Sequence, residues 1–262
     1  MYRVSRHSIS VLLAFVLALA VTGTALAAVV IGVDGARPVA GKRQGTKKQA
    51  GPMGVKPVGW QPLTSAAAAK LVHHSSWEPR PQNYTANHTI PSPAELAEWR
   101  AQSTMPYASL VDGHFKGTTD EIIQWAAYKW GLPADVLRAV AALETWWEQS
   151  FVGDDGDSYG IFQVRRPYHC FGECAIARDS TPFTADYYGG IIRAYYDGKM
   201  TWLNNPDVAS QNGSPYEAGD FWGSVGAWRD GRWHTPFNEE YVAKAKANLA
   251  EKVWTLPEFV GQ

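Results

Sequence analysis

Apolar positions recur at helical spacing along much of the second half of the chain. In residues 122–130 and 136–147 they lie three or four positions apart, which is the period of an amphipathic helix. Thr118 and Glu121 form a capping-box signature before the first stretch, and a glycine follows it as a typical C-terminal residue. The pattern therefore predicts two consecutive helices, with Pro133 in the first turn of the second.

Further helices and one small β element are expected elsewhere in the chain. Three other ranges predict helices: 92–103, 185–196 and 239–254. The Gly- and Asp-rich residues 153–164, and residues 225–233, favour short strands or irregular hairpins. The predicted fold class is therefore mainly α (α+β), with a small β or loop element.

Residues 1–33 have the pattern of an export segment. Two arginines precede an apolar run, and Ala25-Leu26-Ala27 has the form of a signal-peptide cleavage site. Without cleavage, the apolar residues 9–33 are long enough to span a bilayer as a signal anchor. Under both alternatives the rest of the chain is extracytoplasmic, either secreted or membrane-anchored.

Residues 34–90 are rich in Pro, Gly and Ala and show no helical or strand period. Eight basic and two acidic side chains give this stretch a net charge of +6. We interpret it as a basic linker. It either contacts an anionic wall polymer or membrane surface, or serves as a solvated spacer.

Residues 91–262 have the size of a single domain with its own core. They carry 14 basic and 23 acidic side chains, which gives a net charge of −9. A domain this acidic is not expected to bind nucleic acid, because such binding depends on neutralising phosphates with Lys and Arg.

Glu144 is the most informative single residue of this domain. It lies four residues after Val140 and eight after Val136, so its side chain points with the apolar stripe of its helix. Desolvation raises the pKa of a carboxyl group, which is the property required of a general acid near neutral pH. The alternative is a structural glutamate at the edge of the stripe, paired with an arginine.

Three short motifs follow one another in this domain. They are Val140-Ala-Ala-Leu-Glu144, then Asp157-Ser-Tyr-Gly-Ile-Phe-Gln163, then Ala227-Trp-Arg-Asp-Gly231. In order and spacing they resemble the motifs of the soluble lytic transglycosylase (SLT) family of the lysozyme-like superfamily, over about residues 118–260. The resemblance implies a lysozyme-like catalytic domain over residues 91–262.

The resemblance also implies an activity. The family cuts the β-1,4 bond between N-acetylmuramic acid (MurNAc) and N-acetylglucosamine (GlcNAc) in peptidoglycan strands. Glu144 is then the catalytic acid and base, the product ends in 1,6-anhydroMurNAc, and no cofactor or metal is needed. The candidate substrate-binding residues are Ser158, Tyr159, Phe162, Gln163 and Trp228. For Phe162 and Trp228, ordinary core packing is the alternative.

The chain departs from the family motifs at several positions. Thr145 follows Glu144 where the family usually has Ser, a change that keeps the hydroxyl. Trp228 and Arg229 replace the family's Tyr-Asn, so this motif lacks the tyrosine hydroxyl. Arg165-Arg166 either meet peptide-stem or lactyl carboxylates or form a solvated face.

Two other functions are consistent with these residues. A lysozyme-type hydrolase of the same bond can use a second carboxylate, and Asp154, Asp155 or Asp157 are candidates, although a Gly-Asp turn needs such residues for its own geometry. A non-catalytic peptidoglycan-binding or assembly module is the other alternative. The presence of both Glu144 and Gln163 argues against it.

Cys170 and Cys174 are the only cysteines of the chain. Outside the cytoplasm they are expected to form a local disulfide. A zinc site with the adjacent His169 is the alternative, but no fourth ligand is evident in the sequence.

Overall fold

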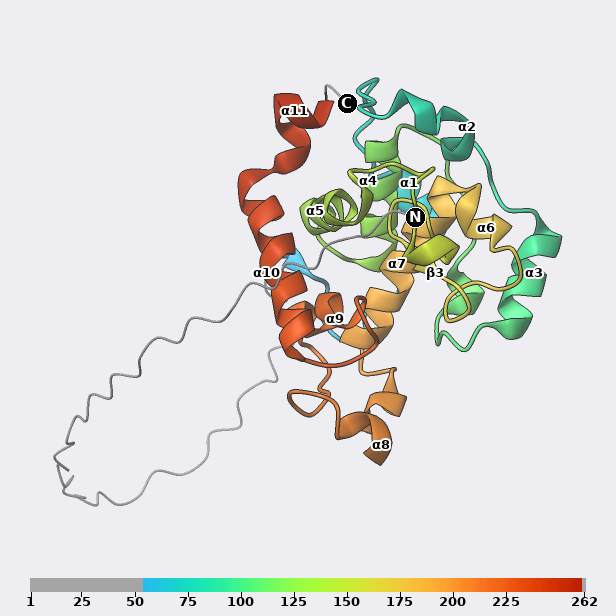
Figure 1. Ribbon diagram of the computed structural model, residues 1–262. Coiled ribbons are helices and arrows are strands. Elements are labelled where there is room, and N and C mark those ends of the chain that lie inside the picture. Colours follow the sequence, from blue (N-terminus) through green and yellow to red (C-terminus); the bar gives the residue numbers. More distant parts are fainter. Residues whose placement is uncertain (1–53, 261–262) are drawn as a thin grey trace, which may run out of the picture. The chain divides into compact units, whose positions relative to one another are not determined.

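Helices make up most of the described part of the chain. The computed structural model describes residues 54–260, which Figure 1 shows as a set of helices with one small sheet. The α-helices in this range are α1 (Ser65–Ala69), α2 (Tyr84–Asn87), α3 (Pro93–Gln102), α4 (Thr119–Trp130), α5 (Ala134–Thr145), α6 (Ala175–Arg178), α7 (Thr181–Tyr196), α8 (Pro206–Ala209), α9 (Phe221–Ala227), α10 (Pro236–Glu251) and α11 (Pro257–Val260). The predicted mainly α class is confirmed.

Helix α7 forms the centre of the core, because all of its residues are buried. It packs against α4 and α9, while α5 packs against both α4 and α10. In Figure 1, α10 runs along one side of the described residues and α3 lies on the opposite side. A side chain at Gly189 of α7 would collide with the indole of Trp130, so this glycine permits the close approach of α4.

The two capping-box signals are confirmed, whereas Pro133 is the N-cap residue before α5 and does not lie in its first turn as predicted. Ser92 before α3 and Thr118 before α4 each form a capping box with the glutamate three residues on. Helices α7 and α10 begin earlier than expected, because Ser180 and Thr235 cap them and a proline stands in each first turn.

Residues 225–233 do not form the expected strands or hairpin. Helix α9 covers the first part of this segment, and Asp220 caps it by accepting a hydrogen bond from the backbone N–H of Gly223 at 2.9 Å. Two glycines lower the intrinsic helix propensity of this short segment, which is why the pattern favoured a hairpin. Packing against α7 and α10 stabilises the helix instead.

The predicted small β element is confirmed in residues 153–164 and their neighbours. Strands β1 (Val152–Gly153), β2 (Ser158–Tyr159) and β3 (Val164–Arg165) form an antiparallel sheet in the order β1-β2-β3. Tyr159 pairs with Val152 on one side and with Val164 on the other. Since the sheet follows α5 directly, it lies at the end of the helix that carries Glu144.

Residues 54–90 pack as part of the folded domain, so their interpretation as a linker is wrong. Val55 is fully buried, and α1 packs against α4. The buried Arg80 donates hydrogen bonds to the carbonyl oxygens of Trp146, at 2.7 Å, and Phe259, at 2.6 Å. Prolines prevent long helices here, but they do not prevent burial. The rest of the expected linker, residues 34–53, lies outside the described residues.

The predicted export segment, residues 1–33, also lies outside the described residues. Within residues 54–260, no helix is both long enough and apolar enough to cross a membrane.

A buried ion-pair network joins α1, α4 and α7. Lys129 of α4 is almost fully buried and donates to Asp186 at 2.7 Å, and to Asp112 and Ser65 at 3.0 Å each. Asp186 also accepts a hydrogen bond from the indole N–H of Trp130 at 2.7 Å. Burial still raises the pKa of Asp186, so these contacts offset the desolvation of its charge only in part.

We expect Lys129→Met to destabilise the domain by about 3–5 kcal/mol, because it leaves the Asp186 carboxylate buried without its cation. Urea unfolding at pH 7 measures this loss. The matched control is Lys244→Met, which removes an exposed lysine paired with Glu240 and should cost about 1 kcal/mol or less. Equal losses in the two variants would contradict the prediction.

Candidate active site

A cleft of about 920 Å³ contains Glu144 and several of the predicted site residues. Side chains from the end of α5, the sheet, α7 and the α9–α10 region line it. A volume of this order is typical of ligand-binding sites. A smaller hollow of about 310 Å³, lined by Trp77, Arg138 and Trp254 among others, does not include Glu144.

Glu144 occupies the last turn of α5 (Ala134–Thr145), at the edge of the apolar stripe predicted from the sequence. Val136 and Val140 of the same stripe are buried, whereas Glu144 is half-buried and faces the cleft. Trp146 adopts a left-handed conformation with φ of 54° and ends the helix immediately after it. Glu144 forms no ion pair with any described arginine, so the alternative of an arginine-paired structural glutamate is not supported.

Tyr241 of α10 donates a hydrogen bond from its hydroxyl to Oε1 of Glu144. The two side chains meet because α5 and α10 pack against each other. Burial disfavours the charged carboxylate and raises the pKa of Glu144 to about 7, although the hydrogen bond from Tyr241 acts in the opposite direction. Near neutral pH the side chain can therefore both donate and accept a proton.

Asp154 is the one of the three candidate second carboxylates that lines the cleft. It accepts a hydrogen bond from the hydroxyl of Ser158 at 2.6 Å, and its negative charge contributes to the raised pKa of Glu144. Asp157 instead pairs with Arg166 at 2.6 Å, and Asp155 does not line the cleft.

Trp228 lines the cleft and also packs in the core. Its indole N–H donates to the carbonyl oxygen of Phe162 at 3.1 Å, and its ring stacks on His169 with 4.9 Å between the ring centroids. Burial lowers the pKa of His169 to about 4, so this imidazole is neutral at pH 7. The indole is therefore held in one orientation, with little of its surface exposed.

Ser158 and Gln163 also line the cleft, as predicted. Ser158 is almost fully buried, and its hydroxyl is fixed by Asp154. Gln163 has a left-handed backbone with φ of 53°, and its amide group donates to the carbonyl oxygen of Gly160 at 3.1 Å. The structure therefore brings Glu144, Ser158, Gln163 and Trp228 to one cleft.

Tyr159 and Phe162 do not line the cleft, so their predicted role in substrate binding is corrected. Neighbouring residues of a strand point to opposite faces, and because Ser158 faces the cleft, Tyr159 faces away. The hydroxyl of Tyr159 donates to the carbonyl oxygen of Gly156 at 2.6 Å. Phe162 is fully buried and stacks on Tyr188 with 4.2 Å between ring centroids.

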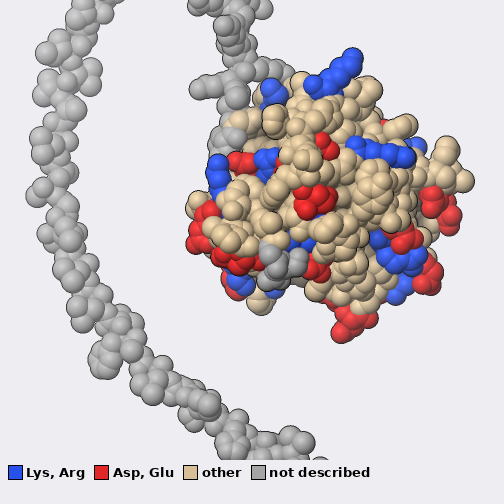
Figure 2. All heavy atoms as spheres, turned by 90° about the horizontal axis from the view of Figure 1, so that it is seen from above, with Lys and Arg blue, Asp and Glu red and all other residues tan. Residues whose placement is uncertain are grey.

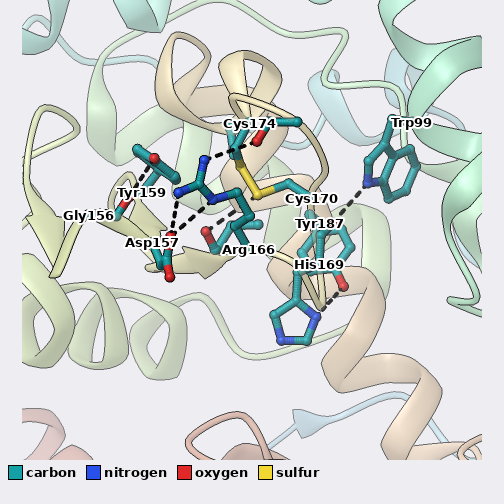
Figure 3. Close-up of a disulfide and its surroundings, with 12 residues drawn as sticks. Trp99, Gly156, Asp157, Tyr159, Arg166, His169, Cys170, Cys174 and Tyr187 are labelled. Atoms are coloured by element: carbon teal, nitrogen blue, oxygen red, sulfur yellow. Dashed lines mark hydrogen bonds and ion pairs between the residues drawn. A yellow bond between two sulfur atoms is a disulfide. The ribbon is translucent and has the colours of Figure 1, made fainter. Parts of the chain in front are cut away.

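The predicted disulfide between Cys170 and Cys174 is confirmed (Figure 3). It closes a loop next to His169, whose carbonyl oxygen accepts a hydrogen bond from Trp99 at 2.9 Å. Since both sulfur atoms are in the disulfide, the zinc alternative is not supported. Residues 54–260 contain no cluster of three or more metal-ligating side chains.

Tyr241 is not among the site residues predicted from the sequence. The third motif has Trp228 and therefore carries no tyrosine hydroxyl, but the hydroxyl of Tyr241 on α10 reaches Glu144. The helix itself was predicted, but which of its side chains meets Glu144 depends on how α10 packs against α5.

Comparisons with models of known families, with curated proteins and with solved structures find no match to this chain.

We expect Glu144→Gln to stabilise the folded protein at pH 8 by about 1–3 kcal/mol. The folded-state pKa of about 7 lies above the ordinary value of 4.5. The contribution of Glu144 to the stability of the wild type is therefore lost as the pH rises between these values, whereas glutamine stays neutral. Urea unfolding at pH 4 and pH 8 measures the difference, which should vanish at pH 4. Glu251→Gln at an exposed site is the control, and a pH-independent difference would refute the prediction.

We expect Tyr241→Phe to raise the pKa of Glu144 above about 7, because the carboxylate loses a hydrogen-bond donor. NMR titration of ¹³C-labelled glutamate side chains follows this pKa without any assay of activity. Tyr159→Phe removes a hydroxyl that binds only the carbonyl oxygen of Gly156, and it should leave the titration unchanged. A lower or unaltered pKa in Tyr241→Phe would contradict the assignment.

Proposed function

We propose that this protein is an exported lytic transglycosylase that cuts the MurNAc-GlcNAc β-1,4 bond of peptidoglycan. The observation that carries the proposal is Glu144, a carboxyl group at the edge of a large cleft with a pKa of about 7 and a hydroxyl hydrogen bond from Tyr241. The three motifs that resemble the SLT family support the same activity. The helical fold with a small sheet is consistent with the lysozyme-like architecture that this resemblance implies.

In the proposed reaction, protonated Glu144 donates its proton to the glycosidic oxygen, and the bond between this oxygen and C1 of MurNAc breaks. The C6 hydroxyl of the same MurNAc then attacks C1, while the Glu144 carboxylate takes up the hydroxyl proton. The products are a GlcNAc end with a free hydroxyl and a 1,6-anhydroMurNAc end. Glu144 is regenerated in its protonated form, so the cycle needs no cofactor.

The other cleft residues have binding roles in this proposal. Ser158 and Gln163 provide a hydroxyl and an amide beside Glu144, which are suited to hydrogen bonds with an N-acetyl group. Trp228 presents only a small part of its indole, so it serves as a fixed apolar wall. The Cys170–Cys174 disulfide is consistent with an oxidising compartment outside the cytoplasm.

Asp154 favours a lysozyme-type hydrolase as the second candidate function. It lines the same cleft as Glu144, and its charge acts on the pKa of Glu144. In a hydrolase, such a carboxylate stabilises the developing positive charge or activates water. Its hydrogen bond from Ser158 leaves one carboxylate oxygen without a side-chain donor among the described residues.

Digestion of purified peptidoglycan by the full-length protein tests the proposal, with products identified by mass spectrometry. We expect products that end in 1,6-anhydroMurNAc, and a rate that falls by about 10²–10⁴ in Glu144→Gln, because general acid catalysis is lost. The control Glu251→Gln should cleave at the wild-type rate.

The products separate the candidate functions. Reducing MurNAc ends in place of anhydro ends would identify the hydrolase and overturn the transglycosylase. If the folded wild-type protein binds peptidoglycan without cleaving it, the protein is the non-catalytic module considered above.

A further inference from the structure

Three arginines line the cleft, and two of them, Arg229 and Arg232, contact neutral partners, whereas Arg165 lies 3.6 Å from Asp154. Arg229 follows the end of α9, and its guanidinium carbon lies 5.0 Å from the ring centroid of Phe237. Arg232 donates two hydrogen bonds to the side-chain oxygen of Gln211, at 3.1 and 3.0 Å, and a third to the carbonyl oxygen of Gly231. Both guanidinium groups therefore have defined contacts, and neither contact is with a carboxylate.

Neither Arg229 nor Arg232 forms an ion pair with a carboxylate of the described residues. Other arginines of the domain do form such pairs: Arg138, Arg166, Arg178 and Arg193 bind aspartates at 2.6 to 2.8 Å. The contrast is notable because residues 54–260 carry 17 basic and 24 acidic side chains, so acidic partners are in excess. Figure 2 shows both kinds interspersed on one face.

Two acidic side chains that line the cleft in this region, Asp230 and Glu240, already have other partners. Oδ1 of Asp230 accepts hydrogen bonds from the backbone N–H of Arg232 at 3.0 Å and from Asn238 at 2.8 Å. Glu240 pairs with Lys244 at 2.7 Å, and both also line the cleft. The loop that carries the two arginines is thereby fixed to α10.

The arginines belong to the same cleft as Glu144. The positive charge of Arg229 lowers the pKa of Glu144, so Arg229 is close enough to act electrostatically on this carboxyl group. A ligand long enough to pass Glu144 and reach Arg229 would meet an oriented guanidinium whose N–H groups are suited to a carboxylate.

We propose that Arg229 and Arg232 form an anion subsite that binds a carboxylate carried by the glycan strand, so that the protein selects strands with anionic substituents. This inference rests on the proposed function, because it takes a muramyl glycan as the ligand of the cleft. The carboxylate comes either from a peptide stem or from the lactyl group of MurNAc that has lost its stem. Neutral N-acetylglucosamine polymers offer neither group.

The test compares strands that differ only in these carboxylates. The assay uses three substrates: strands with peptide stems, the same strands with all carboxyl groups amidated, and strands from which the stems have been removed. Each substrate is digested by the full-length wild type, by Arg229→Gln and by Arg232→Gln. We expect the wild type to have about tenfold higher kcat/KM on the substrate with the recognised carboxylate than on the amidated one. The arginine variants should lose this ratio, whatever their absolute rates.

Lys246→Gln is the matched control, because Lys246 is a cationic residue of α10 that packs over Trp222 and does not line the cleft. It should keep the wild-type ratio. A preference for stem-bearing strands identifies the stem carboxylates as ligands, and a preference for stripped strands identifies the lactyl carboxylate. An unchanged ratio in both arginine variants, or no preference in the wild type, would overturn the subsite.

Binding separates this inference from the proposed function. Calorimetric titration of the same strands into Glu144→Gln and into Glu144→Gln/Arg229→Gln measures affinity without cleavage. If the wild type cleaves no strand but Arg229 still gives about tenfold tighter binding of carboxylate-bearing strands, the proposed reaction fails and the subsite stands. If strands are cleaved but Arg229 has no effect on affinity or on the ratio, the reaction stands and the subsite fails.

Discussion

The chemistry of the cleft depends on one carboxyl group that is partly withdrawn from water. Glu144 is held at the end of α5 by the hydroxyl of Tyr241, and burial keeps its proton bound up to a pH of about 7. The two side chains meet because α5 and α10 pack against each other, and α5 ends at Thr145, one residue after Glu144. Because the folded state disfavours the charged form of Glu144, the domain loses stability when this carboxyl group ionises.

Much of the fold could be predicted from local signals. Capping boxes at Ser92 and Thr118 fix the starts of two helices through hydrogen bonds within four residues, so the sequence alone identifies them. Helix α9 could not be predicted, because its glycines give the segment a low helix propensity and packing against other helices stabilises it instead. Residues 54–90 were misjudged because their partners, such as Phe259 for Arg80, are distant in sequence. A high content of Pro, Gly and Ala indicates which backbone conformations a segment can adopt, but it does not indicate whether the segment is buried.

The candidate site could be predicted only in part, because short motifs identify neighbouring residues but not contacts between distant segments. Glu144, Ser158, Gln163 and Trp228 lie in short motifs, and they do meet in one cleft. Tyr159 lies in one of these motifs too, but strand alternation turns it away, and motif membership alone does not reveal a side chain's direction. Tyr241 lies 97 residues after Glu144 in the sequence, and its contact with Glu144 depends on how α5 and α10 pack.

Arg80 has a consequence for the order in which parts of the domain can fold during synthesis. Its guanidinium binds the carbonyl oxygens of Trp146, just after Glu144, and of Phe259, which lies 179 residues further along the chain than Arg80. A buried guanidinium without these partners is strongly unfavourable. The early segment therefore cannot complete its packing until the last helix has emerged, and the end of α5 is fixed late. In a growing chain, the end of α5 that carries Glu144 therefore reaches its final packing only after α11 (Pro257–Val260) has been synthesised.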